Sequence, residues 1–310
     1  MEQKTNFDII GIGTVAVDDY LHVNHYPEPD QKERVLSRSR KLGGLVGTAL
    51  ASAARIGAAC AFGGALGFDE LSETIKNTFR NLNIDYGISI KHPEGQPTHS
   101  IIIVDDEKHT RNIFFYQQKE FSTYEEIDFG AYSNTKFIYI DQSALKVARN
   151  AHSENVQVIA DMEWLDRDDI DVFMDTVDHL ILPVSVARIL TGKTDPKEML
   201  FAMPQSRRRR CTAITCGEEG CYFISPETDN RVMYQRAFSI EPVETNGCGD
   251  VVHGAYASSL ASGSDIPRSI LFASSAAAIY ASRSGGWEYL PTSAEILELC
   301  DTVNNPAETM

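Results

Sequence analysis

Short apolar stretches rich in β-branched residues recur along the chain and alternate with segments of helical spacing. The strand-like stretches are 7–12, 59–63, 100–104, 136–140, 156–160, 179–182 and 211–215. Apolar residues at helical spacing cover 48–56, 70–82, 145–152 and 197–203. Strands that alternate with helices predict an α/β fold with a mostly parallel sheet covered on both faces.

Two regions break this alternation. Residues 14–42 lack a helical pattern and predict strands over 15–23 and 34–42 around a polar turn. A hairpin is predicted over 98–104 and 110–116. These four strands predict a small second sheet, formed by about 14–42 and 97–117.

The last third of the chain is predominantly helical. Ala-, Leu- and Ile-rich segments of helical spacing cover 249–262, 267–282 and 292–303. Neither a linker rich in Pro, Gly or Ser nor an internal repeat divides the sequence, so we expect a single domain over 1–310.

Composition and charge narrow the function classes. Of the 310 residues, 43% are hydrophobic and 23% are charged, which is enough apolar sequence for a sizeable core. The chain has 44 Asp plus Glu and 28 Lys plus Arg, so its formal charge is −16. Nucleic acid and anionic membrane are therefore poor partners, because net repulsion opposes both.

We expect no secretory leader, because residues 1–6 are polar and lead directly into an apolar strand, and no membrane span, because no apolar stretch is long enough for a bilayer. The six cysteines form no C-x-x-C pair. We expect reduced thiols, a cytoplasmic protein and no dedicated metal ligands.

A glycine pattern near the N-terminus invites a dinucleotide-binding interpretation. Residues 11–16 (G-I-G-T-V-A) fit G-x-G-x-x-G/A after a strand, as in NAD-dependent oxidoreductases. That motif must open a helix, whereas the sequence continues as a strand through Leu21. We expect the glycines to turn the chain out of the main sheet, and a strand at this point would exclude the alternative.

The strongest chemical motif is E-T-N-G-C-G-D at 244–250, followed by a helical segment. Gly247 and Gly249 bracket Cys248 at a helix start, where backbone amides and the helix dipole favour an anion. Asp250 in the first turn could accept a proton from a substrate hydroxyl. An ordinary tight turn at a helix start is the alternative.

These residues resemble the ribokinase (pfkB) family of carbohydrate kinases, over essentially the whole chain. The family signature D-T-x-G-A-G-D matches 244–250 with Glu for the first Asp and Cys for Ala, and the G-G signature before a helix matches 43–57. The family's strand, G-x-G and Asp start is matched by Gly11, Gly13 and Asp18, and 64–69 and 215–220 follow in the family's order. Five ordered motifs make the resemblance specific.

The resemblance implies a ribokinase-like three-layer α/β/α fold with a small β-sheet lid, and ATP-dependent phosphorylation of a sugar hydroxyl. It implies these roles: Asp250 as general base with the Gly247, Cys248 and Gly249 amides as anion hole; Asp18, Gly43, Gly44, Thr48 and Lys32 at the sugar; Thr215, Gly217, Gly220 and Ser274 at the nucleotide. Mg²⁺ would accompany ATP, and a monovalent cation such as K⁺ is a further expectation.

Departures from the family pattern bear on metal and substrate. The usual N-x-x-E is V-S-V-A at 184–187, which puts Mg²⁺ and phosphate dependence through that pair in question. Thr48 and Ala16 replace asparagines and make ribose less favoured. The chain looks most like ketohexokinases and sulfofructose kinases, which phosphorylate the C1 hydroxyl of a ketose. Phe115 and Ser143 replace two residues of the sulfonate pocket, so sulfofructose is the weaker substrate.

One further alternative concerns activity. A sugar- or nucleotide-binding protein that lost turnover would keep the fold, although intact Gly247, Gly249 and Asp250 favour an enzyme. His253, three residues after Asp250, is expected to be structural.

The predicted lid strands carry apolar residues that we expect at the surface, more than are needed to cover a small polar sugar: Leu21, Val23, Ile103, Phe114 and Phe115. We therefore expect a homodimer through the lid, the alternative being a monomer whose lid packs on its own helices.

Overall fold

The computed structural model describes residues 6–91, 96–108, 110–117, 135–151, 156–163, 170–204, 206–302 and 307–310. Its main sheet contains six parallel strands, β1 (Phe7–Ile12), β4 (Cys60–Phe62), β9 (Thr135–Ile140), β10 (Gln157–Ala160), β11 (His179–Pro183) and β12 (Cys211–Thr215). Three antiparallel strands extend one edge, β13 (Cys221–Ile224), β14 (Met233–Gln235) and β15 (Glu308–Thr309). The order is β15-β14-β13-β12-β11-β10-β9-β1-β4.

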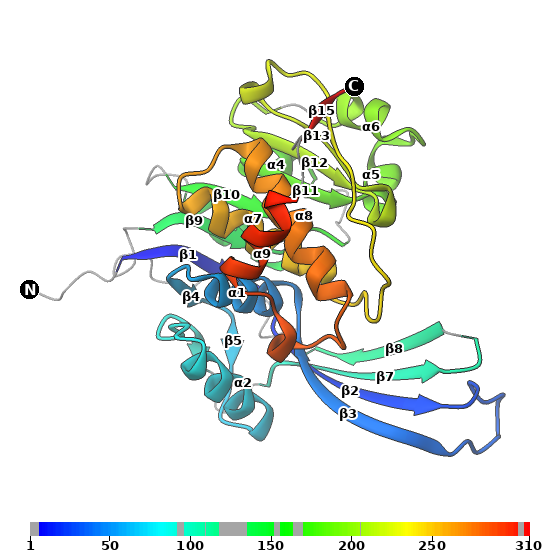
Figure 1. The fold of residues 1–310 in the computed structure, drawn as a ribbon. Coiled ribbons are helices and arrows are strands. Elements are labelled where there is room, and N and C mark those ends of the chain that lie inside the picture. Colours follow the sequence, from blue (N-terminus) through cyan, green and yellow to red (C-terminus); the bar gives the residue numbers. More distant parts are fainter. Residues whose placement is uncertain are drawn as a thin grey trace, which may run out of the picture.

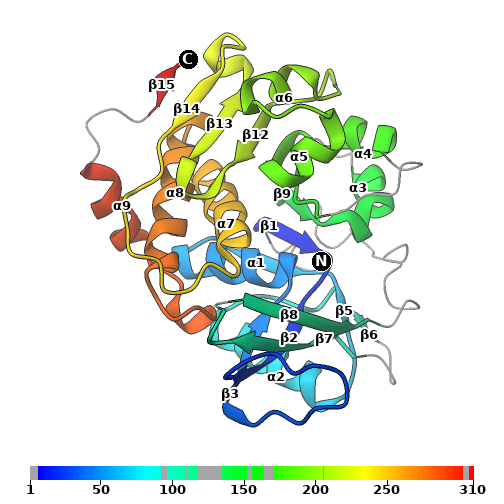
Figure 2. The same ribbon diagram turned by 90° about the vertical axis from the view of Figure 1, so that its right-hand side faces the viewer.

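Helices cover both faces of this sheet (Figures 1 and 2). One layer contains α1 (Leu45–Ile56), α7 (Cys248–Ala261), α8 (Ile266–Ala281) and α9 (Ser293–Asp301), with α2 (Glu70–Asn81) beside it. The other contains α3 (Leu145–Ala151), α4 (Ile170–Thr176), α5 (Val184–Thr191) and α6 (Pro196–Ala202). The two-residue period of a strand explains the two cores, because Ile9 of β1 packs in the first while Ile10 and Ile12 pack in the second.

A separate four-stranded sheet projects from this body (Figure 1). We call it the lid; its strands are β2 (Ala16–Val23), β3 (Val35–Gly43), β7 (Thr98–Asp105) and β8 (Thr110–Tyr116). Their order is β3-β2-β7-β8, with β2 and β7 parallel. A short pair, β5 (Ala65–Leu66) and β6 (Ile90–Lys91), lies apart from both sheets. The predicted α/β fold with a second small sheet is confirmed.

Three parts of this architecture bear on the predictions. After β1 ends at Ile12, the chain enters β2 at Ala16 without forming a helix, which removes the structural basis for a dinucleotide site at residues 11–16. The antiparallel strands β13 to β15, each two to four residues long, were not predicted from the sequence. No helix in the described ranges is both long and apolar enough to cross a bilayer.

Candidate active site

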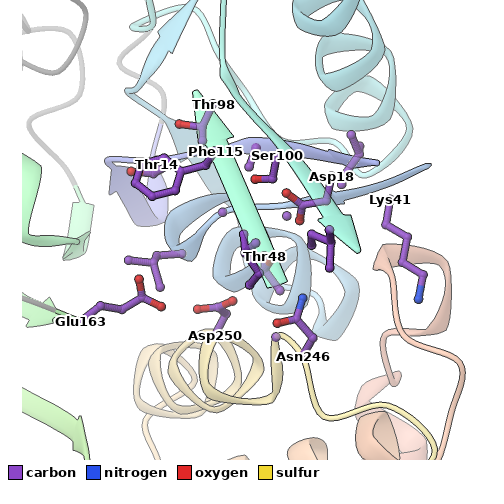
Figure 3. Close-up of a pocket in the computed structure, with 18 of the residues that line it drawn as sticks. Thr14, Asp18, Lys41, Thr48, Thr98, Ser100, Phe115, Glu163, Asn246 and Asp250 are labelled. Atoms are coloured by element: carbon purple, nitrogen blue, oxygen red, sulfur yellow. The ribbon is translucent and has the colours of Figure 1, made fainter. Parts of the chain in front are cut away.

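A cavity of ≈ 260 Å³ lies between the lid and the body (Figure 3). One face of the lid, the first turn of α1 and the N-terminus of α7 supply most of its wall. Gly11 and Gly13 lie at the carboxyl end of β1, the end at which mostly parallel sheets bind ligands, whereas Gly43 ends β3 of the lid and residues 244–250 lead into α7. Of the residues predicted for the sugar and for catalysis, those lining the cavity are Asp18, Gly43, Gly44, Thr48, Gly247 and Asp250.

The N-terminus of α7 has the features of an anion site. Gly247 precedes the helix in the left-handed conformation, with φ 83°, and no side chain within the described residues caps the helix. Cys248 and Gly249 form the next two positions, so their amides lie in the first turn of a 14-residue helix. Partial positive charge at this end favours a phosphate.

Asp250 occupies the same turn and faces the cavity (Figure 3). Burial raises the pKa of its carboxyl well above the usual value, and the nearby Asp161 and Glu163 raise it further. A carboxylate that is costly to keep charged accepts a proton more readily, which suits it to a sugar hydroxyl.

Asp18 and the two glycines of the first signature depend on one another. Asp18 is almost fully buried on β2, where burial raises the pKa of its carboxyl although a hydrogen bond from Ser100 opposes the shift. A Cβ at Gly43 would lie well under 3.0 Å from the Asp18 carboxylate, so a side chain there would force that carboxylate to shift. Gly44, with φ 85°, turns the chain from β3 into α1 against the backbone of Val15 and Ala16.

Thr48 is buried on α1, and its Oγ1 accepts a hydrogen bond from Trp287 Nε1 at 3.1 Å. The hydroxyl keeps its own proton for a ligand in the cavity, which Thr48 also lines. Lys32, in contrast, lies in the exposed segment between β2 and β3 and is not among the cavity residues.

The four residues predicted at the nucleotide also lie outside this cavity. Thr215 ends β12, and Gly217 and Gly220 form the turn into β13 with φ 58° and 93°. Ser274 lies on α8, where its hydroxyl donates to Ile270 O at 2.8 Å.

Sequence reasoning assigned no role to a group of polar residues at the lid end of the cavity. Asn246 Nδ2 donates to the Tyr20 hydroxyl at 2.7 Å. Lys41 Nζ donates to Ser284 O at 2.7 Å and lies 3.8 Å from Glu244 Oε2. No local motif marks these contacts, since Lys41 and Ser284 are 243 positions apart in the sequence.

A second group that the sequence did not reveal consists of carboxyls behind Asp250. Asp141 follows β9 and accepts hydrogen bonds from the Thr14 and Ser143 amides at 2.7 and 3.0 Å. Asp161 and Glu163 follow β10, and Glu163 lines the cavity. Within the described part of the chain, no three His, Cys, Asp or Glu side chains are arranged to hold a metal by themselves.

His253 has a structural position, as expected. Its Nδ1 lies 2.9 Å from Gly249 O and 3.4 Å from Asp161 Oδ2, and its Nε2 lies 3.1 Å from Ile181 O. The ring therefore joins the first turn of α7 to β11 and does not line the cavity.

A second cavity, of ≈ 690 Å³, lies at the opposite end of the sheet. Asp8 and Lys136, near the starts of β1 and β9, contribute to its wall. Open α/β sheets bind their ligands at the other end, the carboxyl ends of the strands, so the first cavity is the candidate site.

Comparisons with known proteins agree with this geometry. A family model described as pfkB family carbohydrate kinase matches residues 7–293. The chain is 23% identical to the ribokinase of Haemophilus influenzae, covering 94% of this chain and 97% of that protein, and 24% identical to the ketohexokinase of Mus musculus, covering 88% and 94%. The structure of Arabidopsis thaliana ribokinase complexed with ribose and ATP superposes with a TM-score of 0.83 at 16% identity, covering 96% of this chain and 99% of that one.

Proposed function

Because the chain belongs to the pfkB family of carbohydrate kinases, we propose that it transfers the γ-phosphoryl group of ATP to the C1 hydroxyl of a ketose, with Asp250 as general base. The observation that carries this proposal is the placement of Asp250, at the start of α7, and Asp18, on the lid, in one cavity. Its volume of ≈ 260 Å³ lies below the usual range for drug-sized ligands and suits one small sugar.

The residues at the cavity suggest three separate roles in the reaction. Asp18 accepts hydrogen bonds from sugar hydroxyls and orients the sugar under the lid. Asp250 takes the proton of the attacking hydroxyl as its oxygen bonds to the γ-phosphorus and the bond to the ADP oxygen breaks. The amides of Gly247, Cys248 and Gly249 stabilise the negative charge that develops on the transferred group.

We propose that ATP approaches this site from the turn formed by Thr215, Gly217 and Gly220. Its phosphates would then point toward the start of α7 across the carboxyl ends of the parallel strands. Mg²⁺ bound with ATP would neutralise part of the charge of the phosphates. Since the enzyme consumes ATP, we place it in the cytoplasm.

A phosphorylation screen tests the function. Ketoses, pentoses, nucleosides and acidic sugars are offered with Mg-ATP, ADP release is measured, and the product is assigned by ³¹P and ¹³C NMR. We expect a ketose 1-phosphate, and repeating the assay with K⁺ replaced by tetramethylammonium tests the monovalent cation. ATP binding without turnover on any sugar would instead support the sugar- or nucleotide-binding protein.

Asp18→Asn is expected to raise KM for the sugar by roughly 10- to 100-fold, the effect of losing one or two hydrogen bonds to a charged group, with a smaller change in kcat. Asp19→Asn is the matched control. Asp19 lies on the opposite face of the lid, where it pairs with Arg40 at 2.7 Å and His99 at 2.8 Å, outside the cavity. Steady-state kinetics that show equal KM values for the two variants would remove Asp18 from the sugar site.

We also propose that two copies associate through their lids. Every residue of the edge strand β8 is exposed, and large apolar side chains are exposed on the lid at Val35, Leu36, Ile101, Ile113, Phe114, Phe115 and Tyr116. An unpaired edge strand with this much apolar surface favours association. Leu21 and Ile103 are only partly exposed, and Val23, expected at the surface, is buried, so Val23 is unsuitable as a probe.

Light scattering at micromolar concentration is expected to give twice the chain mass of 34.4 kDa, and Phe114→Glu to return it to the monomer. The control is Ile189→Glu, because Ile189 is more exposed, at 82% against 52%, but lies on α5 in the body. A monomeric wild type would disprove the dimer, and a dimer that survives Phe114→Glu would place its interface elsewhere.

A further inference from the structure

Tyr280, near the end of α8, places a buried hydroxyl in the wall of the cavity. The residue is 3% exposed and is one of those that line the cavity. A Cβ at Gly247 would lie 3.3 Å from the Tyr280 hydroxyl oxygen and 3.7 Å from Cγ2 of Thr48. The hydroxyl therefore lies beside the start of α7, next to the first residue of the proposed anion hole.

One hydrogen bond fixes this hydroxyl and leaves its proton free. The backbone amide of Gly286 donates to the Tyr280 oxygen at 2.9 Å. Among the described residues, no second atom accepts the proton of the hydroxyl itself. A buried donor ordinarily has a partner, so we expect that partner to be an oxygen of a ligand in the cavity.

The hydroxyl keeps its proton at neutral pH. Burial raises the pKa of Tyr280 above its usual value, the hydrogen bond from Gly286 opposes that shift, and the charge of Asp250 adds to it. Because the oxygen already accepts a hydrogen bond, the hydroxyl faces the cavity as a donor.

Basic groups do not supply a donor at this place. Lys41 is the one Lys or Arg among the cavity residues that the structure describes, and its Nζ donates to Ser284 O at 2.7 Å. A cation beside Asp250 would also lower the pKa of that carboxyl and make it a weaker base. A neutral hydroxyl can bond to an anionic group with much less of this effect.

We propose that the Tyr280 hydroxyl donates a hydrogen bond to an oxygen of the phosphoryl group during its transfer, beside the amides of residues 247–249. The inference rests on the proposed kinase function. Ionised phosphoryl oxygens only accept hydrogen bonds, whereas sugar hydroxyls also donate them, so the phosphoryl group suits a site composed of donors. A donor that Gly286 already holds in place needs no reorganisation as negative charge develops. Tyr280 is then a further catalytic residue that keeps its own proton throughout.

Tyr280→Phe tests this role because it removes only the hydroxyl. We expect kcat to fall by about 100-fold, the lower end of the range for losing one such donor, while the KM for sugar and the affinity for ADP change by less than about threefold. Aluminium fluoride bound together with Mg-ADP imitates the transferred group and requires no turnover of sugar. In calorimetric titrations the variant should bind it at least about tenfold more weakly than the wild type.

Tyr256→Phe is the matched control. Tyr256 lies on α7, is fully buried, bonds through its hydroxyl to His179 Nδ1 at 2.8 Å and does not line the cavity. Both substitutions remove a buried hydrogen bond inside the protein, so both should lower the melting temperature. The control should keep the kcat and the aluminium fluoride affinity of the wild type.

Wild-type kcat or wild-type aluminium fluoride affinity in Tyr280→Phe would overturn the proposal, and so would a wild type that binds ADP but no aluminium fluoride. A rise in the KM for sugar as large as the fall in kcat would place the hydroxyl at the sugar instead, and an equal loss in Tyr256→Phe would reduce the effect to packing. Failure of the kinase function looks different: a wild type that phosphorylates no sugar but loses aluminium fluoride affinity with Tyr280→Phe keeps this donor and refutes only the reaction.

Discussion

Asp250→Asn is expected to lower kcat by about two to four orders of magnitude while the affinity for nucleotide is retained. The amide has the size of the carboxyl but cannot take the proton of the sugar hydroxyl. The start of α7, which supplies the anion-binding amides, is unchanged by this substitution. Steady-state kinetics and calorimetric titration with ATP measure the two quantities. Turnover within a few-fold of wild type would show that Asp250 is not the base.

The raised pKa of Asp250 predicts two further results, one for the wild type and one for this variant. The base must be ionised, so the kcat/KM of the wild type should fall as pH falls through that raised pKa. Burial also makes the ionised carboxyl costly in the folded state: the stability linked to its raised pKa is present at low pH and lost as pH rises through the folded value. Asp250→Asn should therefore melt at a higher temperature than wild type at neutral pH, which separates loss of chemistry from loss of fold. Asp229→Asn, an exposed carboxyl remote from the cavity, should show neither effect.

The hydrophobic pattern was sufficient for the six parallel strands because each is a short apolar stretch buried in the sheet, whereas the lid was predicted from strand-like stretches around polar turns. Asp250 and Gly247 were found because they lie in a local motif at the start of a helix, and Asp18 because it follows the glycines at the end of β1. Glu163, however, is marked by no motif. Its place in the cavity wall appears only once β9 and β10 are paired, which brings the segment after β10 beside that after β9.

The lid shows a second limit of prediction from the hydrophobic pattern. Alternation predicts which residues of a strand share a face but not which face is covered, so Val23 was expected at the surface and is buried. Likewise Asp18 and Asp19 are adjacent and chemically identical in the sequence. The register of β2 with β3 and β7 turns Asp18 toward the cavity and Asp19 toward Arg40.

The two halves of the site are connected by one close helix contact. Gly44 and Thr48 belong to the start of α1, and Gly247 and Asp250 to the start of α7. Further along, Gly254 of α7 lies against the backbone of α1, where a Cβ would come well under 3.0 Å from the Ala49 carbonyl oxygen. Backbone atoms cannot rotate away as a side chain can, so the absence of a side chain at this glycine sets the separation of the two helices.

Gly254→Ala is therefore expected to destabilise the protein by roughly 3 kcal/mol or more, at the upper end of the range for overpacking, and to lower kcat/KM for the sugar because the starts of α1 and α7 move apart. Gly249→Ala is the control, five residues earlier on the same helix. Its Cβ would meet nothing within 4 Å, and alanine favours a helix by about 0.5–1 kcal/mol over glycine, so its melting temperature should be unchanged or higher. Chemical denaturation of both variants and kinetics of Gly254→Ala decide the matter. Equal stability of Gly254→Ala and wild type would show that α1 yields to the methyl group, and that the contact does not hold the sugar and phosphate sites in place.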